Sequence, residues 1–168
     1  MLSMSLLMAA RGFGSLIGPL AAGSWAGQNQ ARLRTLILTG LTIGGIGYML
    51  LGTAPGLVLA CAAVMFAHMG ASNIWVSSTT LLQMNTEDRF RGRVFSADLS
   101  VLTLMMAFST FLAGRILDAG ISARELAVGV GLMVMLPAAA WLWAQGLWKG
   151  SEYEVNAGVG SQGSGAGN

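Results

Sequence analysis

The amino-acid sequence predicts an all-α protein, a polytopic bundle of about five helices that each cross a lipid bilayer. The composition is the first indication: 54% of the 168 residues are hydrophobic and 10% are charged, whereas soluble domains carry about 25% charged residues. The apolar residues also form segments close to the roughly 20 residues that a spanning helix needs. These segments are too long for the strands of a membrane barrel, which need about 9–11 residues.

Five segments are long enough to span, and polar or turn-forming residues separate them. We expect helices over residues 4–26, 36–53, 57–82, 94–117 and 126–148. Pro55 suits the start of the third helix. The most charged stretch, residues 83–93, is expected to be a loop, and Gly120 is expected to cap the fourth helix at its C-terminus.

The chain divides into one helical domain and a tail. Residues 1–149 hold the five spans, and after Lys149 the sequence becomes rich in glycine and serine without apolar periodicity. Such a segment buries too little apolar surface to offset the entropy of ordering. We therefore expect residues 150–168 to be a disordered tail.

Basic residues predict the orientation, because lysine and arginine collect in cytoplasmic loops. Arg115 and Arg124 lie on one side of five alternating spans. The other side holds Arg32, Arg34, Arg89, Arg91, Arg93 and Lys149. We therefore expect the 27–35 loop, the 83–93 loop and the C-terminus in the cytoplasm. Met1 then lies outside, and since Arg11 makes its translocation costly, the simplest explanation is that a longer protein has lost its front.

Glycine is frequent inside the predicted spans. Three pairs have the Gly-x-x-x-Gly spacing that lets helix backbones approach closely in membranes: Gly14 with Gly18, Gly23 with Gly27, and Gly40 with Gly44. We expect these pairs to pack helices statically. The alternative is that smooth faces let two bundles rock against each other.

Polar and aromatic residues within the spans are candidates for a substrate or ion pathway. They are Arg11, Ser15, His68, Ser72, Trp75, Thr79 and Asp98. An arginine at membrane depth costs at least ~2.5 kcal/mol and is a functional hypothesis by default. Arg11 shares a helix face with Ser15 and Gly18, which suggests contact with protein or water, and the alternative is that it snorkels to the outer interface.

The third predicted helix carries two polar stripes. Its four pathway candidates fall at i, i+4, i+7 and i+11, and Asn73, Ser77 and Thr80 form a second stripe well round the helix. One stripe is expected to line a solute cavity and the other to hydrogen-bond to a neighbouring helix. The alternative is that both make interhelical contacts and that His68 is a packed histidine rather than a proton carrier.

Ionic contacts are expected on the fourth helix. Asp98 lies about one turn inside this span, and we expect it to pair with Arg91 or Arg93; the alternative is a proton or cation site. Arg115 and Asp118 are i, i+3 neighbours and are expected to form a local pair.

Several function classes are excluded by what the sequence lacks. Cys61 and His68 are the only residues of their types, which excludes an internal disulfide and a multi-cysteine or His-rich metal site. The sequence has no nucleophile–base arrangement and no Walker loop. We therefore expect no enzyme activity, no catalytic residue, no cofactor and no metal. The scattered arginines argue against a nucleic-acid partner.

Three passages carry a family resemblance: residues 10–23, 81–94 and 113–118. They resemble, in order, the eighth helix, the loop between helices ten and eleven, and the end of helix eleven in a major facilitator superfamily transporter. The drug- and siderophore-efflux branch, with the enterobactin exporter and macrolide efflux proteins, is the most similar. The middle passage is the most specific, and its matching residues form a cytoplasmic loop motif: Glu87, Asp88, Arg91, Gly92 and Arg93.

The resemblance covers residues 1–148 and implies that the five spans correspond to helices 8–12 of a twelve-helix transporter. The charged signature before helix nine is degraded here over residues 23–34, where it lacks its acidic residue. The resemblance implies proton-coupled export of a small hydrophobic compound or siderophore across a bacterial inner membrane, by alternating access between two halves. The bilayer is then one partner, and a small-molecule substrate is another once the missing half completes the bundle.

Two other hypotheses remain beside the transporter fragment. The first is a non-transporting membrane subunit that completes a helix bundle with another membrane chain. The second is a membrane-embedded enzyme using His68, Asp98 and Arg11, which is disfavoured because these residues lie on separate helices at unlike depths.

Overall fold

Five helices make up a computed structural model of the chain, which describes residues 2–163, with side chains as far as residue 144. The helices are α1 (Leu2–Ala26), α2 (Gln30–Thr53), α3 (Leu57–Met84), α4 (Asp88–Asp118) and α5 (Ala123–Gly163). The described residues contain no strand. All five helices are long and apolar enough to cross a membrane, which confirms the predicted fold class.

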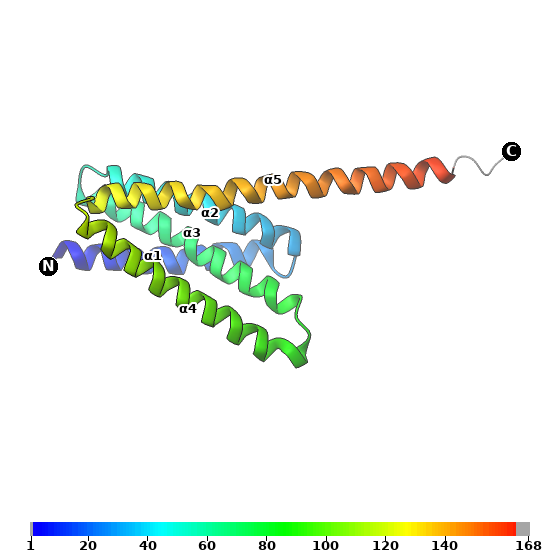
Figure 1. The fold of residues 1–168 in the computed structure, drawn as a ribbon, viewed down its shortest axis with the longest axis horizontal. Helices are drawn as coiled ribbons and strands as arrows, with labels where there is room; N and C mark the ends of the chain where they lie inside the picture. Colours follow the sequence, from blue (N-terminus) through cyan, green and yellow to red (C-terminus); the bar gives the residue numbers. More distant parts are fainter. Residues whose placement is uncertain (1, 164–168) are drawn as a thin grey trace.

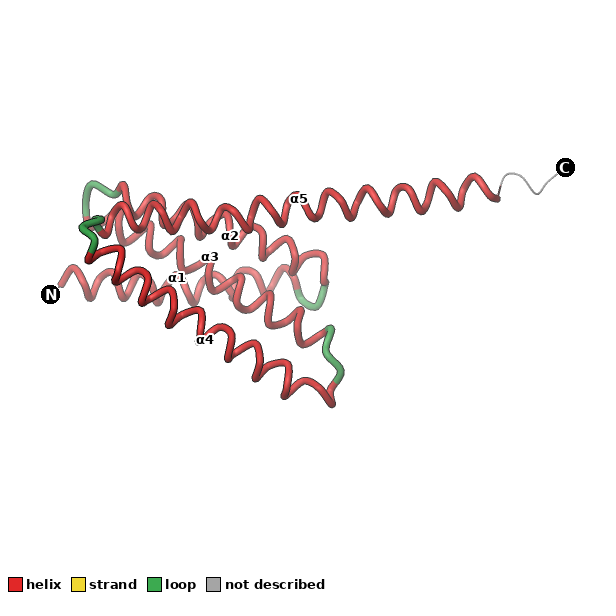
Figure 2. Tube along the Cα trace, viewed as in Figure 1, coloured by secondary structure: helices red, strands yellow, loops and turns green. Residues whose placement is uncertain are grey.

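Successive helices run up and down, and α3 is central to the packing (Figure 1). Both α1 and α2 pack closely on α3, and α2 also packs along α5. The α1–α2 and α3–α4 connections lie at one end of the bundle, the other two connections lie at the opposite end, and α5 projects past the bundle (Figure 2). In contrast, α4 splays away, touches mainly α5, and has no buried residue.

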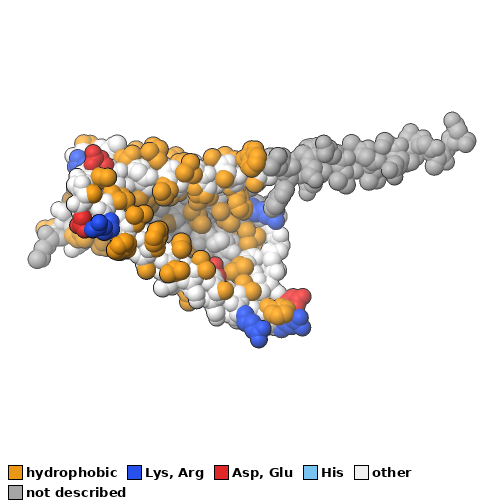
Figure 3. All heavy atoms as spheres, viewed as in Figure 1, with side chains coloured by type: hydrophobic (Ala, Val, Ile, Leu, Met, Phe, Trp, Pro, Cys, Tyr) orange, Lys and Arg blue, Asp and Glu red, His pale blue; other side chains and the backbone are white. Residues whose placement is uncertain are grey.

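Exposed apolar side chains cover much of the surface, as expected for helices that face lipid. Figure 3 shows them along the visible face, with Lys, Arg, Asp and Glu gathered mostly near the two ends. The core is correspondingly small and consists mainly of alanine and glycine, so close backbone contact rather than large buried side chains holds the helices together.

Two helices, α2 and α4, begin six residues earlier than hydropathy predicts, which corrects the positions of several arginines. α2 starts at Gln30, where the Asn29 side chain accepts a hydrogen bond from the Arg32 backbone N at 3.1 Å and caps the helix. α4 starts at Asp88 rather than at residue 94. Polar turns at a helix end carry no hydropathy signal, so residues assigned to the 27–35 and 83–93 loops lie largely on helices.

The predicted tail also differs from the structure, in which α5 continues to Gly163. Extending an existing helix needs no new nucleation, so a polar sequence can continue a helix that an apolar segment has begun. Residues 164–168, the rest of the expected tail, lie outside the described residues, as does the side chain of Lys149.

Helix ends in the bundle follow known capping patterns. Gly120 has φ +92° and follows α4, and the Gly120 N to Leu117 O and Ile121 N to Ile116 O bonds, at 3.0 and 3.4 Å, form a Schellman motif. The predicted C-cap role of Gly120 is thus confirmed. Pro55 was expected to open α3, but it lies outside the helix because Gly56 is the N-cap.

Glycines at helix crossings explain how α1, α2, α3 and α5 come so close together. A Cβ added at Gly14 or Gly18 would collide with the carbonyl oxygen of Met65 or Met69 on α3. At the α2–α3 crossing, a Cβ on Gly40 would lie 2.8 Å from the Gly70 oxygen. The predicted Gly14 and Gly18 packing is therefore confirmed, as is that of Gly40.

The other predicted glycine contacts are weaker or absent. Gly44 is buried, and a Cβ on Gly70 of α3 would lie 2.7 Å from the Gly44 backbone N, so its packing is confirmed as well, although a Cβ on Gly44 itself would meet only the Ala67 oxygen at 3.7 Å. At Gly23 and Gly27 an added Cβ would meet nothing within 4 Å, so the packing expected there is wrong. Gly27 has φ +51°, so its requirement is conformational: it ends α1 in the left-handed region that glycine adopts without strain.

Candidate functional site

The second polar stripe of α3 lies in the interface with its neighbours. Asn73 is 8% exposed and Ser77 is 1% exposed. Asn73 Nδ2 donates to the Leu36 carbonyl of α2 at 3.2 Å, which is an interhelical hydrogen bond. The expectation that one stripe bonds to a neighbouring helix therefore holds at Asn73.

The first stripe is satisfied largely within α3. His68 Nδ1 lies 3.0 Å from the Val64 carbonyl, and the Ser72 hydroxyl donates to the His68 carbonyl at 2.8 Å. The His68 ring also packs near Tyr48 of α2, with centroids 6.3 Å apart. Since a carbonyl oxygen is its partner, Nδ1 carries the ring proton. This is the geometry of a packed histidine, as in the structural alternative.

The remaining members of the first stripe are more open. Trp75 is 46% exposed, and Thr79 is half-buried. The face that α3 presents to α1 is marked by Met65 and Met69, which meet the glycines of α1. The first stripe lies beside that contact face and does not form an enclosed cavity by itself.

Arg11 and Ser15 lie on α1 beside the glycines that contact α3. Gly14 and Gly18 are buried, Ser15 is half-buried, and Arg11 is exposed. Arg11 forms no ion pair among the described residues. At 1.5 Å per residue it lies about 13 Å along the helix from Leu2, which is well inside the apolar segment. The pathway role of Arg11 therefore stays a prediction, as does its alternative, snorkelling to the outer interface.

Asp98 is exposed on α4, and its expected ion pair with Arg91 or Arg93 is wrong. Arg91 instead binds Asp88, with Nη2 and Oδ1 2.7 Å apart. Asp88 is the i−3 neighbour of Arg91 and faces it, whereas Asp98 lies about 10 Å farther along the helix. Within the described part of the chain, Arg115 and Asp118 also form no ion pair, so that local pair is not present either.

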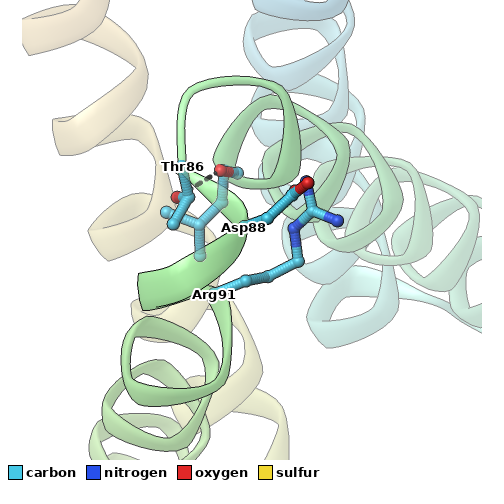
Figure 4. A network of polar contacts seen from close by, with 4 residues as sticks. Thr86, Asp88 and Arg91 are labelled. Carbon is cyan, nitrogen blue, oxygen red and sulfur yellow. Dashed lines mark hydrogen bonds and ion pairs between the residues drawn. The ribbon is translucent and has the colours of Figure 1, made fainter.

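The expected loop motif forms the start of α4 instead of a loop. Figure 4 shows the Asp88–Arg91 pair beside Thr86, whose hydroxyl donates to the Leu82 carbonyl at 2.6 Å. Arg89 contacts Glu87 at 3.5 Å, with both side chains about three-quarters exposed. Exposed pairs of this kind contribute about 0–1 kcal/mol each. The remaining motif residues, Gly92 and Arg93, are exposed, and a Cβ on Gly92 would meet nothing within 4 Å.

The seven pathway candidates are therefore only partly brought together. Arg11 and Ser15 lie on a helix that packs against α3, which carries four more candidates. Asp98 lies on α4, which is separated from both and touches mainly α5. The arrangement offers two polar surfaces of one bundle rather than a closed site.

One recess involves residues that the sequence analysis had not grouped. A cavity of about 270 Å³ lies where α1, α2 and α3 meet, and Asn73 lines it together with small residues of α1 such as Ala21 and Ala22. Beside it, the Arg32 guanidinium stacks 5.4 Å from the Trp25 ring and donates to the Trp25 carbonyl at 2.8 Å. The sequence signal for this recess is the run of small residues on one face of α1, which also serves helix packing.

Comparison with protein families, curated proteins and solved structures gave no match. The class of the protein therefore rests on its fold. Five apolar helices, linked by short connections and four of them packed through glycine, define a multi-pass membrane protein.

Proposed function

We propose that this chain is part of a major facilitator superfamily transporter of the drug- and siderophore-efflux branch, contributing helices 8–12. The observation that carries the proposal is that α4, a 31-residue helix long and apolar enough to span a membrane, has no buried residue, whereas the other four helices pack closely. A bundle that is open along one whole helix fits a part of a larger helical assembly. The resemblance of residues 81–94 gives that assembly its family.

The face of α4 supports this proposal. Small residues recur along it every three or four positions: Gly92, Ser96, Ser100, Thr103, Ala107, Thr110 and Gly114. The hydroxyls on this stripe donate to carbonyls of α4 itself, at 2.7–2.8 Å, so they need no hydrogen-bond partner outside the helix. Small, internally satisfied residues are typical of helix–helix contacts in membranes.

The proposed activity is proton-coupled export of a small hydrophobic compound or siderophore by alternating access in a bacterial inner membrane. Asp98 and Arg11 are the proposed pathway residues, because both are ionisable, exposed and without an ion pair among the described residues. Ionisable groups within spans are costly and commonly mark substrate or proton routes. The C-terminus is proposed to be cytoplasmic.

The DNA immediately upstream of the Met1 codon tests this proposal. We expect a reading frame, continuous or frameshifted, that encodes about seven more apolar spans. Cells expressing the joined frame should accumulate less of an exported dye than cells expressing the joined frame with Asp98→Asn. An upstream region unrelated to membrane spans would overturn the proposal.

A second function, that of a membrane interaction subunit, is favoured by the same exposed helix. In that case α4 docks a helix of a separate chain rather than helices of the same transporter. A photoreactive amino acid in place of Thr103 should then cross-link a second polypeptide in native membranes. Recovery of the monomer alone would exclude the subunit function.

A further inference from the structure

A cavity of about 430 Å³ lies at the end of the bundle where α2 ends and both α3 and α5 begin. The α2–α3 and α4–α5 connections meet at this end (Figure 1). α3 and α5 each pack closely on α2, but they hardly touch each other. The cavity occupies the space left between their first turns. Its volume falls within the roughly 300–1,000 Å³ that is usual for ligand sites.

Aliphatic and small residues form most of the cavity wall. α2 contributes Leu51, α3 contributes Leu57 and Ala60, and α5 contributes Ala123 and Ala127. Leu57 is 37% exposed, so the apolar surface of the cavity continues onto the outside of the bundle. In a membrane, a hydrocarbon chain can therefore enter the cavity from the side without crossing a polar surface.

Arg124 is the one charged residue among the described residues that line the cavity. It is exposed, and its side chain makes no ion pair or hydrogen bond with any residue that the structure describes. Its backbone is held against α2, because a Cβ added at Gly52 would lie 2.5 Å from the Arg124 carbonyl oxygen. An unpaired guanidinium is thus fixed at the edge of an otherwise apolar cavity.

The acidic residues at this end of the bundle are placed elsewhere. The Glu125 carboxylate accepts hydrogen bonds from the backbone N and the hydroxyl of Ser122, at 2.9 and 2.8 Å, and so caps the start of α5. Consecutive residues of a helix do not face each other, so Glu125 is not a partner for Arg124. Asp118, at the end of α4, does not line the cavity. The positive charge of Arg124 therefore remains available to an anion.

We propose that this cavity binds a phospholipid with an anionic headgroup, such as phosphatidylglycerol. Arg124 binds the phosphate, because a guanidinium matches two phosphate oxygens at once. It is the second residue of α5, which places it near the membrane surface, where lipid phosphates lie, and the start of one acyl chain lies along Leu57 and Ala60. Basic pockets between spanning helices bind anionic headgroups in this way.

This inference goes beyond the transport proposal, because no residue of α4 lines the cavity. A zwitterionic lipid carries its own cation next to the phosphate, so it should bind less tightly than an anionic one. The lipid site is therefore expected to discriminate by headgroup charge, whereas a purely apolar cavity would accept either lipid.

Photoreactive lipids test the site in the full chain. The protein is placed in phosphatidylethanolamine vesicles that contain the same small fraction of either photoreactive phosphatidylglycerol or photoreactive phosphatidylcholine. Both probes carry a diazirine at the same acyl carbon near the ester, and labelled residues are mapped by mass spectrometry. We expect saturable labelling of the first turns of α3 and α5, about tenfold stronger with phosphatidylglycerol than with phosphatidylcholine.

Three variants separate the charge of Arg124 from the shape of the cavity. Arg124→Gln should lower labelling by phosphatidylglycerol to the level of phosphatidylcholine, whereas Arg124→Lys keeps the charge and should retain most of it. Ala60→Phe fills the cavity and should lower labelling by both probes. Arg115→Gln is the matched control, because Arg115 is also exposed and lies in the last turn of α4, but does not line the cavity. It should change neither.

Three results would overturn the proposal. Equal labelling by the two probes would make the cavity a surface for any lipid chain. Unchanged labelling by phosphatidylglycerol in Arg124→Gln, whose exposed position leaves the packing intact, would remove the role of the guanidinium. An equal loss in Arg115→Gln would show a general attraction of this end for anionic lipid. Failure of the transport proposal, judged from the upstream DNA, would change none of these measurements.

Discussion

At the scale of single residues, the bundle depends on positions where no side chain fits. Gly14 faces the backbone of Met65, and an added Cβ would collide with that carbonyl oxygen. Gly12, two residues earlier, has nothing within 4 Å of the same added atom and is exposed. The two residues are both glycines on the same helix, and they differ only in the atoms that surround them.

We therefore expect opposite effects from the same substitution at these two sites. Gly14→Ala should destabilise the protein by about 1–3 kcal/mol, because α1 must move away from α3. Gly12→Ala should be neutral or stabilising by up to about 1 kcal/mol, since alanine favours the helix. Unfolding by sodium dodecyl sulfate in mixed micelles measures both. Equal losses at the two sites would contradict the packing described for α1 and α3.

Residue identities predict some contacts well and others poorly. The Gly14 and Gly18 spacing indicated an interface because close backbone approach requires small residues at a fixed period. The same spacing at Gly23 and Gly27 indicated an interface that is absent, because a spacing motif does not show whether a partner helix reaches those glycines. Asp98 was assigned an arginine partner because the two are near in sequence. Arg91 pairs with Asp88 instead, since residues three apart lie on the same face of a helix.

At the scale of the helices, hydropathy located all five spans but not their ends. The apolar parts of α2 and α4 were found, while their polar first turns were assigned to loops; these turns follow the N-cap positions Asn29, whose side chain caps α2, and Glu87, whose side chain makes no cap hydrogen bond. Hydropathy reports transfer into lipid, whereas a helix begins where a cap satisfies the first backbone N–H groups. The recess around Asn73 was not predictable, because it depends on how far apart α1 and α2 sit on α3.

The two faces of α4 should meet different surroundings in the membrane. Thr103 lies on the small-residue stripe, and Met105 lies on the opposite side of the helix. If the stripe docks a helix, a nitroxide at residue 103 should collide several-fold less often with dissolved oxygen than one at residue 105. Paramagnetic resonance in native membranes measures this, with Cys61→Ala as the background. Equal collision rates would mean that α4 faces lipid on both sides.

At the scale of the whole molecule, the connections divide into two groups at opposite ends of the bundle. The α1–α2 and α3–α4 connections share one end with the extension of α5 (Figure 1). The arginines at residues 32–34 and 89–93 belong to that end, because they lie in the first turns of α2 and α4. The α4–α5 connection, with Arg115 and Arg124 near it, lies at the other end. The structure thus keeps the charge asymmetry even though most of these arginines lie on helical turns.

This asymmetry predicts which end faces the cytoplasm, because the end richer in arginine is retained inside. Gln28→Cys and Ser122→Cys, each in a Cys61→Ala background, place one thiol at each end, both at exposed positions. In intact spheroplasts a membrane-impermeant maleimide should label residue 122 and spare residue 28 until the cells are lysed. The reverse pattern would invert the chain in the membrane and would place the α4 motif outside. Labelling of both sites in intact spheroplasts would mean that the chain inserts in two orientations, as expected if its orientation depends on helices of a larger assembly.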